Sequence, residues 1–498
     1  MDSQRLKNQR LEVIAAAMAP AAVVGALNRD VAGVTCDSRQ VRPDVLFVAV
    51  AGAEKDGWAF VNEAIRRGAA AVVSEHEPPM HGAKQVTFIR VANARLALAQ
   101  AACRFYDEPA RILKMTGITG TNGKTTTAYL IAQLFEAAGW STGLISTIEY
   151  RIGTRSIPAS QTTPDAPQLQ LLLARMVAAG CRCAVMEVSS HSLDQHRVAG
   201  VDYDLAVFTN LTRDHLDYHC SMEAYFVAKR RLFEMLGHGE KPAVAVINRD
   251  DEWGRKLPSV LGGRAAALTY GMNAGADVMA EDISLSTGGT MFTVCTPWGK
   301  AGIRLGLMGR HNVNNALAAL ATGGVSGISL ENMAAQLALP VTVPGRLQAV
   351  VNNKGFQVFV DYAHTDDALA NVLGALREVR HDRLLVVFGC GGNRDTGKRA
   401  AMGAVAARWA DYTVLTSDNP RKEDPGAIIA QIQSGFADAG RYEVVVDREQ
   451  AIGRILELAK PGDIVLIAGK GHETYQEFAD KKIPFDDRDV ARRILEAM

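Results

Sequence analysis

The chain has 498 residues, 48% of them hydrophobic, which is enough for roughly two to four domains with sizeable cores. Its 54 lysines and arginines balance 54 aspartates and glutamates, and this zero net charge argues against general binding to nucleic acid or membrane surfaces. Seven scattered cysteines without zinc-site spacing predict buried thiols in a reducing compartment. The apolar patch near the N-terminus is too short for a membrane span, so we expect a soluble cytoplasmic protein.

Short β-branched runs alternate with amphipathic stretches along most of the chain, a pattern that predicts parallel sheets covered by helices. In chain order we expect strands at residues 45–50, 69–74 and 86–91, a helix at 93–105, a strand at 112–119 and a helix at 124–138. Further strands are expected at 142–146, 183–188, 205–209 and 243–247. Residues 277–308 alternate in polarity, which indicates an antiparallel extension of the sheet, and a helix is expected from His311.

A domain boundary is expected at residues 341–350, because a fresh alternation of strands and helices follows it. Its strands are expected at 356–362, 383–388, 412–416, 443–446 and 464–468, which make a complete doubly wound unit. We therefore predict an α/β protein of three domains. These are an N-terminal α/β domain at 1–92, a central domain with a mostly parallel sheet at 93–342, and a Rossmann-like doubly wound domain at 343–498. The central domain contains the sequence GITGTNGKT at residues 117–125, between a predicted strand and a predicted helix, which is typical of a P-loop-type ATPase domain.

The sequence GITGTNGKTTT, residues 117–127, lies between a predicted strand and a predicted helix. Free N–H groups and the helix dipole face an anion at such a turn. Lys124 can reach the β- and γ-phosphates of ATP, and the Thr125 hydroxyl can bind Mg²⁺. The strict phosphate-loop spacing fails because residue 118 is Ile, so a glycine-rich turn without a ligand is the alternative. The candidate ATP-binding residues are Gly120, Thr121, Asn122, Gly123, Lys124, Thr125 and Thr126.

This loop resembles the ATP loop of the Mur ligases and of their folylpolyglutamate synthetase relatives. Five further motifs resemble the same family in the same order: MEVSSH at 186–191, NLTRDHLD at 210–217, GRHNVNN at 309–315, PGRL at 344–347 and DYAH at 361–364. Several matches in order are more specific than any one of them. The resemblance implies an ATP-dependent amide ligase that activates a carboxylate as an acyl phosphate, with charge stabilised by Mg²⁺ and by cations.

The resemblance implies that Thr125, Glu187 and His215 bind Mg²⁺, and that Lys229 is carbamylated by CO₂ and helps to hold the metal. Together with Lys124, the residues Glu187, His215 and Lys229 form the expected catalytic set. Carbamylation needs a transiently neutral amine, so a lowered pKa of Lys229 is expected. Taken alone, His215 would be a helix-capping or surface residue, and Lys229 would lie on a solvated helix face.

The resemblance also implies three nucleotide contacts outside the loop. Asn312 is expected on the adenine side, Arg346 at the phosphates from the domain boundary, and Asp361 from the third domain. The alternative for Asn312 is a helix N-cap. Asp366 stands where the family often has Pro, which leaves only the start of the local helix in question.

The first two domains are expected to bind UDP-N-acetylmuramoyl-L-alanyl-D-glutamate. In the first, UDP-binding domain the resemblance implies contacts from Cys36, Ser38, Ala53, Glu54 and Lys55. In the second it implies contacts from Gln161, Thr162, Thr163, Ser189, Gln195 and Arg197. A guanidinium such as Arg197 suits a carboxylate because it donates two parallel hydrogen bonds. Taken alone, these residues would form an ordinary turn or lie on the surface.

The third domain is expected to select the incoming amino acid. Asp418, Asn419, Pro420 and Arg421 follow a predicted strand and resemble the signature of ligases that add meso-diaminopimelate. The Arg421 fork suits the extra carboxylate that lysine lacks, and it would repel a lysine ammonium. Arg394 is expected to bind the same zwitterion, and Gly469 and Glu473 its distal ammonium. The alternative for this motif is a turn with a surface arginine.

We therefore expect a monomeric ligase that uses ATP, Mg²⁺, the UDP-linked dipeptide and meso-diaminopimelate, with a hinge near Pro344 and Gly345. Neither nucleic acid nor a membrane is expected as a partner. The alternatives are a lysine-adding Mur ligase, a folylpolyglutamate synthetase, or a nucleotide-binding regulatory protein without turnover.

Overall fold

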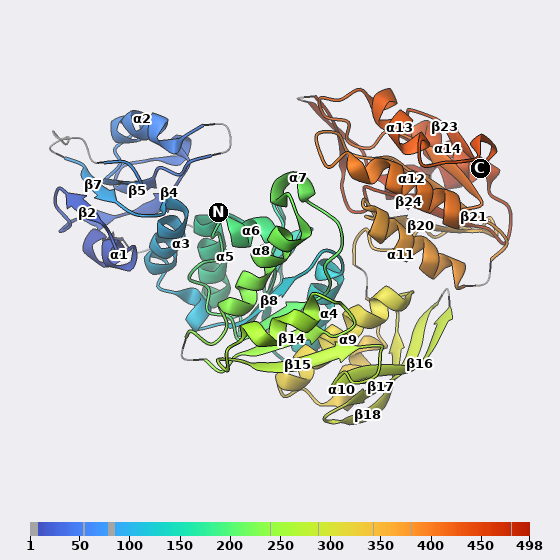
Figure 1. The fold of residues 1–498 in the computed structure, drawn as a ribbon, viewed down its shortest axis with the longest axis horizontal. Helices are drawn as coiled ribbons and strands as arrows, with labels where there is room; N and C mark the ends of the chain where they lie inside the picture. The colour runs from blue at the N-terminus through green and yellow to red at the C-terminus, as the bar shows by residue number, and fades with distance from the viewer. Residues whose placement is uncertain are drawn as a thin grey trace.

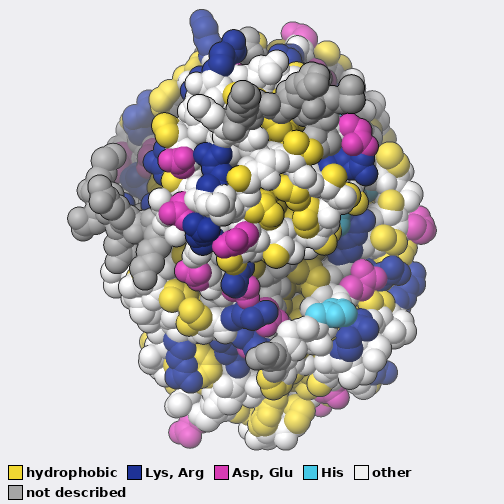
Figure 2. Space-filling model, turned by 90° about the vertical axis from the view of Figure 1, so that its left-hand side faces the viewer, with side chains coloured by type: hydrophobic (Ala, Val, Ile, Leu, Met, Phe, Trp, Pro, Cys, Tyr) yellow, Lys and Arg dark blue, Asp and Glu magenta, His cyan; other side chains and the backbone are white. Residues whose placement is uncertain are grey.

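Three principal sheets organise the chain in the computed structural model, one in each successive unit (Figure 1). The structure describes residues 8–52, 55–77, 85–239, 241–286, 288–341, 343–379, 381–479 and 481–498. Within them, no helix has the length and apolar composition that crossing a bilayer would need. On the face shown in Figure 2, basic and acidic side chains are interspersed, which agrees with the balanced charge of the sequence.

The first unit contains a five-stranded sheet in the order β2-β7-β6-β5-β4. Its elements are β1 Gln9–Arg10, α1 Leu11–Ala17, β2 Ala22–Val24, β3 Asp30–Val31, β4 Gly33–Thr35, β5 Val45–Val48, α2 Val61–Arg66, β6 Ala71–Ser74, β7 Thr87–Arg90 and α3 Ala94–Phe105. Asn93 starts α3 as predicted, since its side chain accepts a hydrogen bond from the Leu96 amide. Helix α3 packs on α1 and β4 of this unit and on α5 of the next unit, so it connects the two.

The central unit contains an eleven-stranded sheet in the order β11-β10-β9-β12-β8-β13-β14-β15-β16-β17-β18. Its strands are β8 Lys114–Thr119, β9 Thr142–Ile145, β10 Glu149–Ile152, β11 Arg155–Pro158, β12 Cys183–Glu187, β13 Leu205–Phe208, β14 Val244–Asn248, β15 Ala266–Gly271, β16 Val278–Ser286, β17 Gly289–Thr296 and β18 Gly299–Leu305. Its helices are α4 Lys124–Ala137, α5 Ala166–Ala178, α6 Ser190–Asp194, α7 Leu216–His219, α8 Met222–Glu234, α9 Arg310–Val325 and α10 Leu330–Leu337. Strands β16, β17 and β18 pair antiparallel, which confirms the predicted extension.

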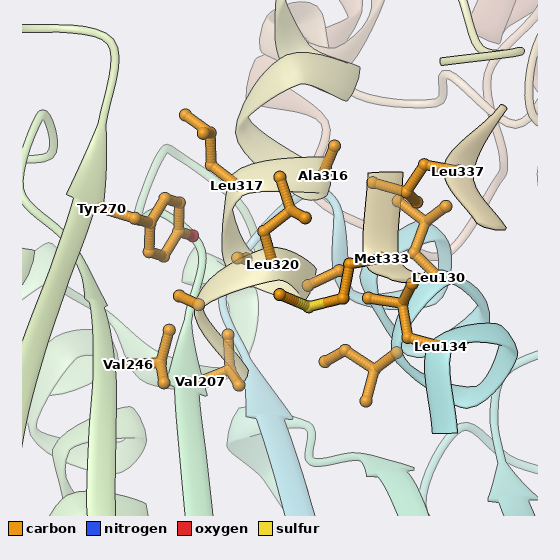
Figure 3. Packing of buried hydrophobic residues seen from close by; sticks show 14 of the residues in the cluster. Leu130, Leu134, Val207, Val246, Tyr270, Ala316, Leu317, Leu320, Met333 and Leu337 are labelled. Carbon is orange, nitrogen blue, oxygen red and sulfur yellow. The ribbon is translucent and has the colours of Figure 1, made fainter. Parts of the chain in front are cut away.

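Helices α4, α9 and α10 cover one face of the central sheet (Figure 3). Leu130 and Leu134 of α4 lie against Leu320 of α9 and Met333 of α10, above the sheet residues Val207, Val246 and Tyr270. These side chains are buried almost completely. Because α4 begins at the glycine-rich loop, this packing fixes the position of the loop on the sheet.

The third unit contains a six-stranded sheet in the order β19-β20-β24-β21-β22-β23, parallel except for β19. Its elements are β19 Gln348–Ala349, β20 Gln357–Asp361, α11 Asp366–Arg377, β21 Leu384–Phe388, α12 Gly397–Trp409, β22 Tyr412–Leu415, α13 Pro425–Gln433, β23 Tyr442–Val444, α14 Arg448–Leu458, β24 Ile464–Ala468, β25 Tyr475–Phe478, β26 Lys481–Pro484 and α15 Asp487–Ala497. The doubly wound prediction is confirmed. Helix α11 starts at Asp366 without Pro, because the Thr365 hydroxyl caps it.

The cysteines differ in part from their predicted burial. All seven are free thiols, and Cys103, Cys181, Cys183 and Cys390 are buried as expected. Cys36 and Cys295 are only partly buried, and Cys220 is exposed, so the prediction of uniformly buried thiols is wrong. Cys220 lies in the turn between α7 and α8, where loop residues face solvent.

Candidate functional site

The glycine-rich loop lies at the carboxyl edge of the central sheet, between β8 and α4. Strand β8 has β12 on one side and β13 on the other, so residues that follow these strands surround the loop. Asn210, after β13, accepts hydrogen bonds from the amides of Thr121 and Asn122, each 2.9 Å long. Gly123 has a φ of +86°, and a Cβ there would collide with the side chain of Asn315. The loop therefore needs glycine at this position and is fixed by its neighbours.

A cavity of about 290 Å³ opens beside this loop, between α9 and the third unit. Six of the residues expected at the nucleotide line it: Asn122, Gly123, Thr126, Asn312, Arg346 and Asp361. Arg346 also donates a hydrogen bond to the Thr125 hydroxyl (3.3 Å), so the segment that joins the units reaches the loop. The third unit contributes Asp367, whose carboxylate accepts a hydrogen bond from the Asn122 side chain (2.5 Å). The cavity is thus built from both units.

Asn312 does not cap a helix, so the N-cap alternative is wrong. The cap position of α9 is Gly309, and Asn312 lies inside the first turn. Its side-chain nitrogen donates to the Met308 carbonyl (2.8 Å), and its oxygen accepts from Asn315 (3.0 Å). The residue is 5% exposed and borders the cavity, which leaves the nucleotide-side interpretation in place.

Lys124 and Lys229 converge on one backbone oxygen. The Nζ atoms of Lys124 and Lys229 lie 2.9 Å and 2.7 Å from the Gly120 carbonyl oxygen. Lys229 is 1% exposed, so the solvated-face alternative is wrong. Burial lowers the pKa of both amines, and the charge of Lys124 lowers that of Lys229 further. The Lys229 amine, for which we expected a lowered pKa, is therefore buried beside the glycine-rich phosphate loop.

Glu187 ends β12 and is completely buried. Its carboxylate accepts hydrogen bonds from the Thr147 amide (2.9 Å) and the Thr147 hydroxyl (3.2 Å). Its charge favours the protonated form of Lys124, which places the carboxylate within electrostatic reach of the phosphate loop. Thr147 follows β9, the neighbour of β12 in the sheet, so the strand order explains this contact.

His215 occupies the cap position of α7 with a φ of +54°, but its side chain caps nothing. The Nε2 atom lies 3.4 Å from a carboxylate oxygen of Asp214. Burial lowers the pKa of His215 to about 3, with a further contribution from the charges of Lys124 and Lys229. The imidazole is therefore neutral at physiological pH, the form that can bind a metal. In the described part of the chain, no three His, Cys, Asp or Glu side chains form a preassembled metal cluster.

The residues expected at the muramoyl dipeptide meet in one hydrogen-bonded group. Arg197 donates to the side chains of Gln195 (2.7 Å) and Gln161 (2.6 Å) and to the Thr163 carbonyl (3.2 Å). The Ser189 amide donates to the Thr163 hydroxyl (3.0 Å). Thr162 links the group to Glu187, because its hydroxyl accepts a hydrogen bond from Thr147, which also contacts the Glu187 carboxylate.

Of the residues expected at the UDP moiety, Cys36 lines a cavity of about 530 Å³ together with Asp165 of the central unit, and Ser38 and Lys55 are not among the lining residues. Burial and the charge of Asp165 raise the pKa of the Cys36 thiol to about 11. Ser38 is 7% exposed, its hydroxyl lies 3.4 Å from a Glu63 carboxylate oxygen, and it starts a short 3-10 helix, Ser38–Gln40. Lys55 is exposed, and Ala53 and Glu54 lie outside the described residues.

A cavity of about 640 Å³ separates the central unit from the third. The third unit lines it with Arg394, Asp418, Asn419, Arg421, Gly469 and Glu473, and the central unit with Gln161, Thr162 and His215. Pro420 is not among the lining residues but lies in the same loop. The motif that follows β22 therefore faces Gln161 and Thr162 of the dipeptide group across this cavity.

Arg421 is partly buried, and its guanidinium has fixed partners. Nε lies 3.0 Å from a Glu477 carboxylate oxygen, and one terminal nitrogen donates to the Gly392 carbonyl (2.8 Å). The alternative of a free surface arginine is wrong. Two contacts leave other N–H groups of the fork for a ligand in the cavity.

Glu473 and Asn419 are linked through Lys470. Nζ of Lys470, which is completely buried, lies 2.9 Å from the Asn419 oxygen and 3.1 Å from a Glu473 oxygen. Asn419 in turn donates to Glu473 (2.8 Å). Burial raises the pKa of Glu473, while Lys470 and Asn419 act in the opposite direction. Lys470 and Asn419 together hold the Glu473 carboxylate at the cavity wall.

Sequence reasoning missed several residues that line this cavity, namely Thr147, Asp214, His364, Lys398 and His472. Lys398 is 8% exposed at the start of α12, where a lysine in the sequence resembles an ordinary first-turn residue. Asp214 stands within the NLTRDHLD motif, which could have indicated it. His364 likewise stands in the DYAH motif, and Thr147 becomes recognisable through its contact with Glu187 in the central unit. Lys398 and His472 become recognisable only when the third unit is placed against the central one.

Three parts of the chain match family models: residues 30–106 the Mur ligase family catalytic domain, residues 118–323 the Mur ligase middle domain, and residues 345–471 the Mur ligase glutamate ligase domain. Together, this fold and the phosphate loop define an ATP-dependent amide ligase. The matches cover most of the chain in the order of its three units. The chain belongs to the Mur ligase family, which confirms the resemblance.

Two curated relatives carry the name UDP-N-acetylmuramoyl-L-alanyl-D-glutamate–2,6-diaminopimelate ligase. The protein from Geobacter sulfurreducens is 45% identical over 501 residues, covering 97% of this chain and 98% of its own. The protein from Geobacillus kaustophilus is 46% identical over 469 residues, covering 93% of this chain and 95% of its own. The similarity therefore includes all three units.

Solved structures show the same arrangement. A structure of a ligase with that same name is 34% identical, covers 99% of both chains and has a TM-score of 0.71. The MurF ligase of Thermotoga maritima in complex with ADP has a TM-score of 0.63 at 20% identity, over 94% of this chain and 96% of its own. The latter similarity shows the shared fold.

Proposed function

We propose that this ligase adds meso-2,6-diaminopimelate to UDP-N-acetylmuramoyl-L-alanyl-D-glutamate and converts ATP to ADP and phosphate. The observation that carries the proposal is the 640 Å³ cavity. It is bordered by His215, by Gln161 and Thr162 of the dipeptide group, and by the Arg421 motif. A ligase must bring an activated carboxylate and an amine together in one enclosed space. The names of the relatives supply the substrate pair.

The residues beside the phosphate loop fit ATP. The 290 Å³ cavity is lined by polar asparagines and by Arg346, and it is continuous with the start of α4, where backbone N–H groups are available. Gly120 has a φ of +151° and Gly123 a φ of +86°, and a Cβ at either position would collide with a neighbouring side chain, so the loop needs glycine at both. Lys124 is proposed to bind the terminal phosphates, and Asn312 and Asp361 to contact the nucleoside.

The donor set also fits Mg²⁺. This cation keeps several water ligands and needs only one or two carboxylates from the protein. Glu187 offers a buried carboxylate, Thr125 a hydroxyl and His215 a neutral imidazole, so a preassembled cluster is not required. Bound there, the metal would neutralise charge on the phosphoryl oxygens.

A carbamate on Lys229 is supported by the state of its amine. The side chain is buried, and its lowered pKa increases the neutral fraction that can attack CO₂. The attack forms an N–C bond and releases one proton, and it turns a cation into an anion that can help to hold Mg²⁺. Tyr225 packs on the amine, with Nζ 4.5 Å from the ring centre.

The reaction proceeds in two balanced steps. A γ-carboxylate oxygen of the D-glutamyl residue attacks the γ-phosphorus of ATP, the bond to ADP breaks, and an acyl phosphate forms. The amine of diaminopimelate then attacks the acyl carbon, phosphate leaves, and the nitrogen loses a proton to give the amide. Lys124 stabilises the negative charge at phosphorus, and the third unit orients the amine.

Arg197 is proposed to hold the dipeptide carboxylate, and its replacement by Ala tests this role. We expect the KM for the UDP-dipeptide to rise about 10- to 100-fold, since hydrogen bonds to charged groups contribute roughly 1.5–3 kcal/mol each. The KM for diaminopimelate should stay within about twofold, the range that a distant surface change produces. The exposed Arg175 of α5 supplies the control, Arg175→Ala, and equal effects in both variants would contradict the role. Steady-state phosphate release measures both KM values.

Phosphate release with a panel of amino acids tests the proposed function itself. The protein is incubated with ATP, Mg²⁺ and the UDP-dipeptide, and meso-diaminopimelate, L-lysine and L-glutamate are added separately. We expect release only with meso-diaminopimelate, because the Arg421 and Arg394 guanidinium groups face the cavity and suit an extra carboxylate. Release with lysine alone would establish the lysine-adding alternative, and no release at all would favour a regulatory protein.

A further inference from the structure

A completely buried ion pair lies behind the amino-acid cavity. Arg448, the first residue of α14, donates from Nε and one terminal nitrogen to the two carboxylate oxygens of Asp487, the first residue of α15, at 2.8 Å and 2.7 Å. Both side chains are 0% exposed. Such a paired geometry leaves the guanidinium planar and fixed, with N–H groups pointing away from Asp487.

Those remaining N–H groups reach the ends of two strands. One donates to the Ala468 carbonyl at the end of β24 (2.9 Å) and another to the Ser417 carbonyl after β22 (3.3 Å). The guanidinium also lies 3.9 Å from the Asp418 carboxylate. The proposed amino-acid residues follow directly, Asn419 to Arg421 after Ser417 and Gly469 to Glu473 after Ala468.

Strands β22 and β24 do not pair with each other, because β21 lies between them. Ladder hydrogen bonds therefore do not set the separation between the two loops directly. Arg448 contacts both strand ends across β21 and is itself held by Asp487. Its position thus helps to determine how far Arg421 lies from Glu473 across the cavity, together with the direct contacts of Asn419 with Lys470 and Glu473.

We propose that Arg448, fixed by Asp487, is a positioning residue that sets the spacing of the two loops that bind the incoming amino acid. The proposal rests on the proposed function of this cavity. Arg448 does not line the cavity, so it acts through the Ser417 and Ala468 carbonyls and the Asp418 carboxylate. A bound amino acid with charged groups at both ends is sensitive to this spacing.

Arg448→Lys tests the proposal, because lysine keeps the charge but cannot contact Asp487 and both carbonyls together. We expect the KM for diaminopimelate to rise about tenfold or more, since an error near 1 Å in placement can cost up to about 100-fold. The KM for ATP should remain within twofold. Asp487→Asn keeps the shape of the pair, so it should raise the KM for diaminopimelate by a smaller factor and likewise leave the KM for ATP within twofold.

The matched control is Arg454→Lys on the same helix, where Arg454 is largely exposed and paired with Glu443. It should change neither KM. Thermal melting of each variant shows that the chain is folded. A purely structural role predicts that the KM values for ATP and diaminopimelate rise together, or that only the melting temperature falls, and either result in Asp487→Asn or Arg448→Lys overturns the proposal.

The wild-type panel separates this proposal from the substrate assignment. Should the wild-type protein use an amino acid other than diaminopimelate, the same variants are measured with that amino acid. A selective rise in its KM supports the positioning role even though the assigned substrate is wrong. An unchanged KM in folded variants refutes the positioning role whichever amino acid is used.

Discussion

Arg421→Ala is expected to lose diaminopimelate use while retaining ATP binding. The side chain faces the 640 Å³ cavity, and Glu477 and Gly392 fix its guanidinium there. Two charge-assisted hydrogen bonds to a carboxylate contribute about 3 kcal/mol, so kcat/KM for diaminopimelate should fall roughly 100-fold. The Kd for ADP, measured by calorimetry, should stay within about twofold, because the nucleotide cavity is separate.

Two further variants separate the contribution of the planar guanidinium donors of Arg421 from that of its positive charge. Arg421→Lys keeps a cation but not the planar pair of donors, so most of the loss should remain. Lys422→Ala removes the adjacent, exposed charge and should have little effect. Full activity of Arg421→Lys would reduce the role to simple charge attraction, and full activity of Arg421→Ala would remove Arg421 from the substrate site.

Several of the candidate site residues follow single strands, whereas Lys229, Asn312 and Arg346 do not and are indicated only by the family resemblance. Lys124 and Arg421 come directly after buried strands, and parallel strands place their carboxyl ends at one edge of a sheet. Local chemistry therefore indicated each loop separately. The strand order β12-β8-β13 places the residues around the phosphate loop. This order depends on which strands pair, and local sequence patterns do not predict the pairing.

Other residues depend on contacts between distant segments. Lys470 lies between the candidate residues Gly469 and Glu473, but the sequence does not indicate its role, because its contact with Asn419 exists only once β24 and β22 share a sheet. Arg448 resembles any helix-start arginine until Asp487, 39 residues later, is placed against it. Asn312 was open to a capping interpretation because cap positions shift by a few residues, and the structure assigns that position to Gly309.

Removal of the Lys229 amine is expected to abolish most turnover without unfolding the protein. Lys229→Met keeps the length and the apolar stem but cannot form a carbamate, so Mg²⁺ would lose one proposed anionic partner. Loss of such electrostatic stabilisation should lower kcat about 100- to 1,000-fold in phosphate-release assays. Arg230→Met is the matched control, because Arg230 is partly exposed and paired with Glu234 on the same helix, and it should keep near-normal kcat.

Two measurements separate chemistry from stability in Lys229→Met. Burial lowers the folded-state pKa of Lys229 below its unfolded value, so below that value the unfolded chain binds the proton more readily and the buried amine reduces stability. Methionine removes this penalty, and the variant should melt no lower than the wild type at pH 7. With ¹³C-bicarbonate, the wild type should show a carbamate carbon resonance that Lys229→Met lacks. A wild type without that resonance would contradict the carbamate, and a methionine variant with normal kcat would contradict any catalytic role of the Lys229 side chain.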